Sequence, residues 1–383
     1  MAVANLCMLS SFGTFFLFPL FITERGGNEA DIGVIMGAFA LASVLCRPFI
    51  SEMIDRIGRK RSYTVGAACM TACPLLYLLF RGYLANFYYP LLIARIVHGV
   101  GFAICITSAF TFVADLVPPK RLNEGVGIFG VSGLVVSAVG PVIAEVILKH
   151  AGFPTLFGFA AGIACIGLLI HLPLSETYVH VSKIPSGSFF MVFKMNRILF
   201  VGILAFLFGF GIAASNNFIA PFAYEKRLVF ISLFYVSYSS AAVLTRFFGG
   251  KMGDHLGEER IIPYALLMVG GGLLSLTLPG GELMLLLSGF LGGCGHGLLY
   301  PSLNVLAIRG EPAHMKGKIT GVFTRSIDAG VFVGSIVLGY IGRWAGFPSL
   351  FLTAGMALVL AFVIFWVETR WQWASTRHCH RGE

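Results

Sequence analysis

The chain has 383 residues, of which 57% are hydrophobic and only 12% charged, and its mean hydropathy is +0.85. Soluble domains carry about a quarter charged residues, so this composition excludes an ordinary water-soluble enzyme or binding domain. The net charge of +9 would suit a nucleic-acid binder, but the basic residues concentrate in alternate loops between apolar stretches, and we expect no nucleic-acid partner.

Twelve apolar stretches follow one another along the chain, each long enough to cross a hydrocarbon layer of roughly 30 Å. No Lys or Arg precedes the first stretch, so we interpret it as a span and not as a cleaved signal peptide. The sequence therefore predicts an all-α membrane protein with twelve transmembrane helices, at residues 3–23, 31–50, 62–81, 87–113, 125–148, 153–174, 198–222, 231–252, 261–279, 283–307, 318–342 and 347–368.

The loops differ in charge from one side of the expected bundle to the other. Loops on one side are rich in basic residues such as Arg59, Lys60 and Lys316, whereas the other side has few. Positive charge is retained on the cytoplasmic side during insertion. We therefore expect a multi-pass protein of the bacterial inner (cytoplasmic) membrane, surrounded by the lipid bilayer, with both termini cytoplasmic.

Two segments recur along the chain in the same order. Residues 47–61 align with 246–260 without a gap, and 151–157 match 345–351 at every position but one. This repeat predicts two pseudo-symmetric six-helix bundles with a substrate site between them. The expected parts are an N-terminal bundle at 1–174, a cytoplasmic linker at 175–197, a C-terminal bundle at 198–369 and a cytoplasmic tail at 370–383.

Three motifs resemble signatures of the major facilitator superfamily, and the likeness covers the whole chain. The loop Asp55-Arg56-Ile57-Gly58-Arg59-Lys60 is similar to the signature between its second and third helices, and Gly250 to Gly257 is a decayed copy. The stretch from Arg95 through Gly99 to Gly101 resembles the fourth-helix signature. Gly140-Pro141 resembles part of the signature of the drug/metabolite:proton antiporter branch. Ser51 stands where the signature around Asp55 has a glycine. Ala144 and Glu145 stand where the antiporter signature has glycines, and this second departure weakens the assignment to export.

The resemblance implies a secondary transporter that works by alternating access. Asp55 lies at a cytoplasmic helix end where it could bind the N-terminus of a neighbouring helix, so we expect a cytoplasmic gate rather than a plain solvated loop. Close packing is expected at Gly99 and Gly101, and packing with bending at Gly140-Pro141. The expected gate consists of Asp55, Arg56, Gly58, Arg59 and Lys60, with Asp254 and Gly257 in the second half.

Ionisable groups inside spans are costly and therefore suggest function. Asp328 lies near the middle of the eleventh span, and Arg325 lies one helical turn away. Burial opposes ionisation of a carboxyl group whereas a nearby arginine favours it, so a proton could bind in one state and leave in the other. We expect proton coupling at Asp328 and Arg325, modulated by Arg95, with Glu145 nearer the outer end and within reach of water. The alternative is a static Arg325–Asp328 pair.

Polar residues inside other spans are candidates for a substrate cavity, although lone intramembrane histidines are more often hydrogen-bonded structural residues. These candidates are His98, Asn216, Asn217, His296, Tyr300 and Asn304.

The expected function is proton-coupled efflux of a small amphipathic drug or metabolite. We expect a monomer, and we expect protons and the lipid bilayer as its other partners. Gly140-Pro141 and the aromatic content of 14% favour this function. Proton-coupled uptake of an organic anion or a sugar-like metabolite is the alternative within transport, and a non-transporting sensor, a channel or an intramembrane enzyme is the alternative outside it. The sequence has no Gly-rich phosphate loop ending in Gly-Lys-Ser/Thr and no His-Glu-x-x-His pair, so we expect no enzyme activity, cofactor or metal.

Overall fold

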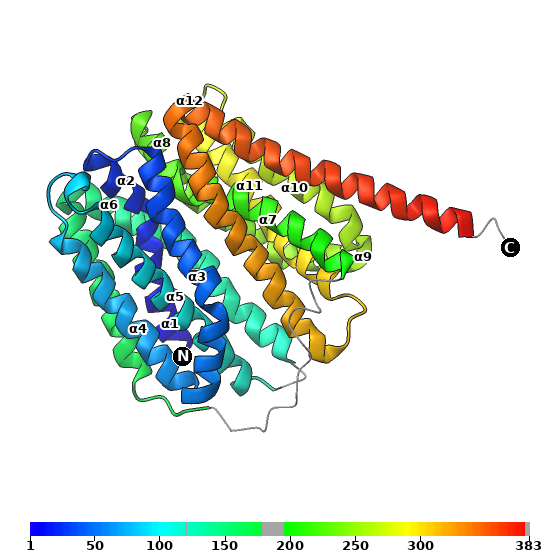
Figure 1. Ribbon diagram of the computed structural model, residues 1–383, viewed down its shortest axis with the longest axis horizontal. Helices are drawn as coiled ribbons and strands as arrows, with labels where there is room; N and C mark the ends of the chain where they lie inside the picture. The colour runs from blue at the N-terminus through cyan, green and yellow to red at the C-terminus, as the bar shows by residue number, and fades with distance from the viewer. Residues whose placement is uncertain (119–120, 178–194, 380–383) are drawn as a thin grey trace.

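The computed structural model describes residues 1–118, 121–177 and 195–379, apart from the side chains of Pro48, 122–124, 126–128, 131, 248–256, 313–314 and 370–379. All regular structure in this part of the chain is helical (Figure 1). The elements are α1 Ala2–Thr14, η1 Phe15–Leu17, α2 Phe18–Glu24, α3 Glu29–Ile57, α4 Arg59–Leu76, η2 Tyr77–Leu79, η3 Leu84–Asn86, α5 Tyr88–Leu116, α6 Leu122–His171, α7 Asn196–Asn217, α8 Ile219–Glu225, α9 Ser232–Leu256, α10 Glu258–Ser275, α11 Glu282–Ile308 and α12 Ala313–Cys379.

Eight helical stretches are long and apolar enough to cross a membrane, within the part that the structure describes. Two of them, in α6 and α12, change direction at a glycine and so supply two spans each. The helices α9 and α10 complete the predicted set of twelve. The predicted fold class is confirmed, with one difference: residues 370–379, expected as a tail, continue α12, whose end runs past the bundle in Figure 1.

The internal repeat is visible in the backbone at four turn glycines. Gly152 and Gly346 have φ of 70° and 75°, and Gly58 and Gly257 have φ of 95° and 78°. With ψ between 150° and −177°, these conformations are open essentially only to glycine. Each bundle therefore repeats the same two turns. We call the end of the molecule with Gly58 and Gly257 the basic face, and the end with Gly152 and Gly346 the opposite face.

Local chemistry fixes the start of α3, the helix that carries several functional residues. The side-chain oxygen of Asn28 accepts hydrogen bonds from the backbone nitrogens of Ala30 and Asp31, at 2.9 and 3.2 Å. In return, the carboxylate of Asp31 accepts from the Asn28 nitrogen at 2.9 Å. This reciprocal cap satisfies donors that the first helical turn leaves open. It sets the start of α3 on the opposite face, and Gly58 ends the helix on the basic face.

The two halves meet through α3 against α12, α6 against α9, and α2 against α8. Figure 1 shows the elements up to α6 on one side and α7 to α12 on the other. The first contact is very close near the opposite face, because a Cβ added at Gly339 would lie 2.6 Å from the backbone oxygen of Glu29. Small residues allow such approach between membrane helices. Arg47, Asp328 and Glu145 lie along this junction.

Candidate functional site

An ion pair joins the two halves in the middle of their junction. Nη2 of Arg47, in α3, lies 2.5 Å from Oδ2 of Asp328, in α12, and each side chain is about a quarter exposed. Nη1 of Arg47 also lies 3.5 Å from the hydroxyl of Thr324. At 1.5 Å per residue, Arg47 lies about 15 Å along α3 from its end on the basic face. Asp328 therefore faces the junction and not the lipid.

We expected Arg325 beside Asp328, but the ion pair that the structure shows for Asp328 is with Arg47, and a role of Arg325 in proton coupling stays a prediction. Two residues three positions apart lie on one side of a helix, but a cation on the facing helix can approach a carboxylate more directly, as Arg47 does. Sequence reasoning missed Arg47 as a site residue. The available signal was its recurrence, because Arg47 and Arg246 occupy equivalent positions in the two repeats.

We also expected Arg95 to modulate Asp328, but the structure buries Arg95 inside the first half, at 2% exposure. Its guanidinium carbon lies 4.7 Å from the centre of the Phe18 ring and 4.8 Å from that of Phe39. Its Nη2 lies 3.3 Å from the sulfur of Met36. Cation–π contacts of this kind offset part of the cost of a buried charge. Arg95 therefore belongs to the core of one half, and in the described structure it forms no ion pair with Asp328.

Two of the intramembrane histidines, His98 and His296, occupy equivalent helices, α5 and α11, and have the same kind of partner. Nδ1 of His98 lies 3.0 Å from the hydroxyl of Tyr77, and Nδ1 of His296 is hydrogen-bonded to the hydroxyl of Tyr238. His98 is completely buried. Each hydrogen bond holds neighbouring elements of one half together. This arrangement matches the alternative that these histidines are hydrogen-bonded structural residues.

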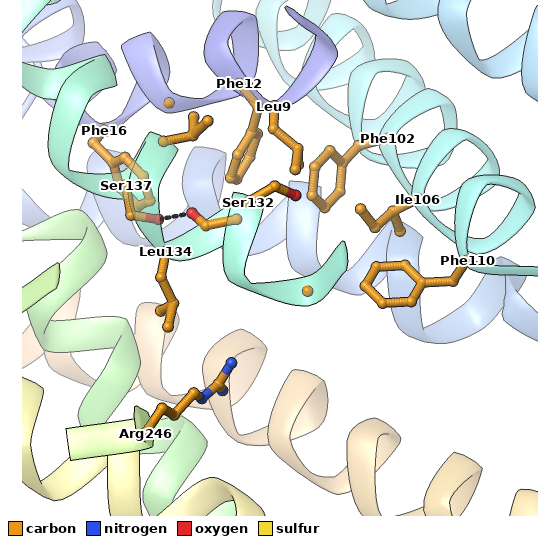
Figure 2. A pocket seen from close by; sticks show the side chains of 14 residues that line it. Leu9, Phe12, Phe16, Phe102, Ile106, Phe110, Ser132, Leu134, Ser137 and Arg246 are labelled. Atoms are coloured by element: carbon orange, nitrogen blue, oxygen red, sulfur yellow. Dashed lines mark hydrogen bonds between the residues drawn. The ribbon is translucent and has the colours of Figure 1, made fainter. Parts of the chain in front are cut away.

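A cavity of about 280 Å³ lies between the halves. Figure 2 shows aromatic and aliphatic side chains on one wall, with the guanidinium of Arg246 reaching toward them from the other half. Phe12 and Phe102 stack with their ring centres 4.2 Å apart. The lining residues are Leu9, Phe12, Gly13, Phe16, Phe102, Ile106, Phe110, Gly130, Ser132, Gly133, Leu134, Val136, Ser137 and Arg246. The cavity runs from mid-bundle toward the basic face, because Leu9 lies in the first half of the span Ala2–Glu24 and Phe110 lies six residues before the end of α5.

The six residues expected in a substrate cavity do not line this one. Asn217 donates a hydrogen bond to the hydroxyl of Ser335 at 2.7 Å, and Asn304 accepts one from Thr320 at 3.1 Å, all within the second half. Asn216 is half-buried in α7. Tyr300 comes nearest to the expectation, because its ring centre lies 5.6 Å from the guanidinium carbon of Arg246. The helices present aromatic residues to the cavity instead, and sequence could not fix which helix faces turn inward.

Glu145 closes the junction on the opposite face. It is 5% exposed, so our expectation that water reaches it is wrong. Its carboxylate accepts hydrogen bonds from the backbone nitrogens of Ile231 and Ser232, at 3.1 and 2.7 Å. Nζ of Lys149 lies 2.9 Å from the same carboxylate and donates to the backbone oxygen of Val229 at 2.6 Å. We call these five residues the clasp. It holds α6 to the N-terminus of α9, where negative charge is favoured.

Further contacts seal the same end of the molecule. The rings of Phe16 and Tyr235, from opposite halves, lie 5.4 Å apart, and the Tyr235 hydroxyl donates to the Phe16 oxygen at 3.5 Å. On the basic face, each ion pair between described side chains stays within one half. Among the described side chains, the clasp and the contact of Phe16 with Tyr235 cross between the halves toward the opposite face, while the cavity lies toward the basic face.

The predicted gate motif holds the basic face of the first half together. Nη1 of Arg59 lies 3.2 Å from Asp55, and its Nε lies 3.0 Å from Asp115. The carboxylate of Glu176 accepts from the backbone nitrogens of Arg59 and Lys60, at 2.9 and 3.1 Å, and so caps α4. These contacts join α3, α4, α5 and the segment after α6. The expected contact of Asp55 with the N-terminus of a neighbouring helix, made in one state and broken in the other, stays a prediction.

The remaining motif residues are placed as follows. Arg56 pairs with Glu52, 2.6 Å away and one turn earlier on α3. In the second half, Gly257 precedes α10 in the same conformation as Gly58 before α4. The side chain of Asp254 lies outside the described residues.

The four packing residues lie where helices come close. A Cβ at Gly99 would lie 2.5 Å from the backbone oxygen of Phe39, and one at Gly101 would lie 2.5 Å from the Cβ of Cys69. A Cβ at Gly140 would lie 2.6 Å from the Cα of Gly13. These glycines let α5 approach α3 and α4, and let α6 approach α1. Pro141 lies inside α6, but the non-helical residue of that helix is Gly152.

Comparison with known proteins agrees with this architecture. A sequence model of the Major Facilitator Superfamily matches residues 1–324 and, in an overlapping second match, residues 201–377. The staphylopine export protein of Staphylococcus aureus is 22% identical, over 91% of this chain and 90% of its own length. The multidrug resistance protein MdtG of Klebsiella pneumoniae is 24% identical, over 89% of this chain and 85% of its own.

Solved structures share the fold. A crystal structure of a mutant of the nucleoside transporter NupG superposes with a TM-score of 0.77 and 14% identity, over 95% of this chain and 99% of that one. The human organic anion transporter MFSD10 gives a TM-score of 0.69 and 16% identity, over 95% and 97%. Family match, shared fold and repeated six-helix halves agree that the chain belongs to the major facilitator superfamily and is a membrane transporter rather than an enzyme.

Proposed function

We propose that this protein exports a small amphipathic solute by alternating access, in exchange for protons that bind at Asp328. The observation that carries the proposal is the Arg47–Asp328 ion pair, which joins the two halves about 15 Å along α3 from its end on the basic face. A contact at this point is made or broken as the halves rock against each other. Protonation of Asp328 can therefore be coupled to the movement of the two halves.

The proposed coupling uses the charge of one carboxylate. When Asp328 is ionised, it attracts Arg47 across the junction and favours the state closed at the opposite face. A proton on Asp328 removes that attraction, so the halves can separate there and close elsewhere. The proton is released when Arg47 again approaches Asp328, because a nearby cation favours the ionised form.

Export is supported by relatives that are named for export or drug resistance. We propose that the protein lies in the inner membrane of a bacterium, with the basic face and both termini on the cytoplasmic side. In this topology the cavity accepts solute from inside the cell. The bundles are proposed at 1–174 and 198–369, with a linker at 175–197, of which 178–194 lie outside the described residues. A monomer suffices, since the cavity lies between two halves of one chain.

The test is solute-driven proton release in everted membrane vesicles from cells that overproduce the protein. The vesicles are acidified by respiration and then given a panel of amphipathic compounds that includes a quinolone. The wild type should collapse the pH gradient with at least one compound, and Asp328→Asn should not.

Glu259→Gln is the matched control, since it removes an exposed carboxylate from the start of α10. We expect it to behave as the wild type does. An Asp328→Asn protein that still releases protons would contradict the proposal. Solute that leaves the vesicles together with protons would instead support the uptake alternative.

A further inference from the structure

The cavity holds a cation whose charge the described residues do not balance. Arg246 lines the cavity from α9, and its one described ring contact is Tyr300, at 5.6 Å. It forms no ion pair with any described residue. A charged group inside a membrane protein is costly, and it is retained where it binds a partner, a substrate or an ion.

The equivalent arginine of the first half shows the contrast. Arg47 and Arg246 begin the two copies of the same repeat, on α3 and α9. Arg47 is neutralised by Asp328, 2.5 Å away, whereas Arg246 faces open space in the cavity. The second half therefore presents a guanidinium group to the cavity, whereas the equivalent group of the first half is paired with Asp328 across the junction.

The rest of the lining favours an apolar body with no positive charge. Phe12, Phe102 and Phe110 come from α1 and α5, on the wall that Arg246 faces in Figure 2. The lining contains no aspartate or glutamate. Its two hydroxyls are already used, because Ser132 donates to the Phe129 oxygen at 2.6 Å and Ser137 to the Gly133 oxygen at 2.8 Å.

We infer that the transported solute is a small amphipathic organic anion, whose acidic group binds Arg246 while its apolar part packs against Phe12, Phe102 and Phe110. This inference rests on the proposed transport function and specifies the solute. A guanidinium group binds carboxylate, sulfonate or phosphate oxygens through paired hydrogen bonds. The cavity volume of about 280 Å³ is near the lower end of ligand sites, so the solute is small. A cation would meet Arg246 with no carboxylate to compensate.

The test compares three probes that share a phenylbutyl body and differ in the head group: 4-phenylbutyrate, 4-phenylbutan-1-ol and 4-phenylbutylamine. Their binding to the detergent-purified full chain is measured by calorimetric titration. The wild type should bind the acid most tightly and the amine least. Arg246→Gln should weaken binding of the acid about ten- to hundredfold and leave the alcohol unchanged. Arg246→Lys should recover part of the affinity for the acid.

Arg343→Gln is the matched control, because Arg343 is an exposed arginine near the opposite face. It should bind all three probes as the wild type does. Equal binding of the three probes, absence of binding by the acid, or an equal effect of Arg246→Gln on acid and alcohol would overturn the inference. These results would leave the test of the proposed function intact, because vesicle flux that depends on Asp328 is measured without reference to the head group.

Discussion

The clasp provides the sharpest test of how the two halves are held together. Glu145→Gln keeps the size of the side chain but removes its charge and turns one acceptor oxygen into a donor. The variant loses one of the two hydrogen bonds to Ile231 and Ser232, at 3.1 and 2.7 Å, and the attraction to Lys149. A hydrogen bond to a charged group and a charge at a helix N-terminus together stabilise the closed opposite face by about 2–3 kcal/mol. The variant should therefore shift the conformational equilibrium about 30- to 150-fold toward opening there.

The measurement is a distance between two spin labels at the opposite face. Glu24 and Glu225 are exposed and end α2 and α8, which contact each other across the junction. Labels on cysteines at these two positions, in a background without the native cysteines, should give a short distance in the wild type. Glu145→Gln should add a longer distance as a major population, because the two short helices separate when the opposite face opens.

Glu282→Gln is the control for loss of a similar hydrogen bond. The Glu282 carboxylate accepts from the backbone nitrogen of Val229 at 3.0 Å, but both residues belong to the second half. This variant should keep the wild-type distance. If Glu145→Gln also keeps it, or if Glu282→Gln opens the face equally, the clasp does not hold the halves together.

Three further changes test the packing. Gly339→Val should force α3 and α12 apart and lengthen the same label distance, whereas Gly317→Val on α12, where a Cβ meets nothing within 4 Å, should not. Gly346→Ala should lower the free energy of unfolding by about 1–3 kcal/mol, because φ of 75° with ψ of 171° suits only glycine. Thermal unfolding should show this loss, and Gly271→Ala should lack it, since its added Cβ also meets open space. Arg95→Met should keep or raise the unfolding temperature, because Nε and Nη1 of this buried cation have no hydrogen-bond partner; a drop of several degrees would show that the charge is needed for stability.

Sequence alone was sufficient for the membrane fold, because hydrocarbon thickness fixes the length of every span. The internal repeat was also readable, since Gly152 and Gly346 stand in nearly identical segments, and the structure gives both the same turn conformation. Asp328 was recognised as a site candidate because an acidic residue in a span is costly. All of these inferences depend on properties local to a segment.

The partners of the charged residues were decided only by the tertiary structure. Arg47 and Asp328 are far apart in the chain, and they meet because glycines let α3 and α12 approach closely. Glu145 reaches the N-terminus of α9 in the other half, so a residue that resembled a proton carrier holds the closed face. The cavity wall depends on the rotation of each helix about its axis, and neighbouring helices set this rotation. For this reason the sequence identified the ionisable groups, whereas the packing of distant helices determined which of them bind each other and that Arg246 faces the cavity.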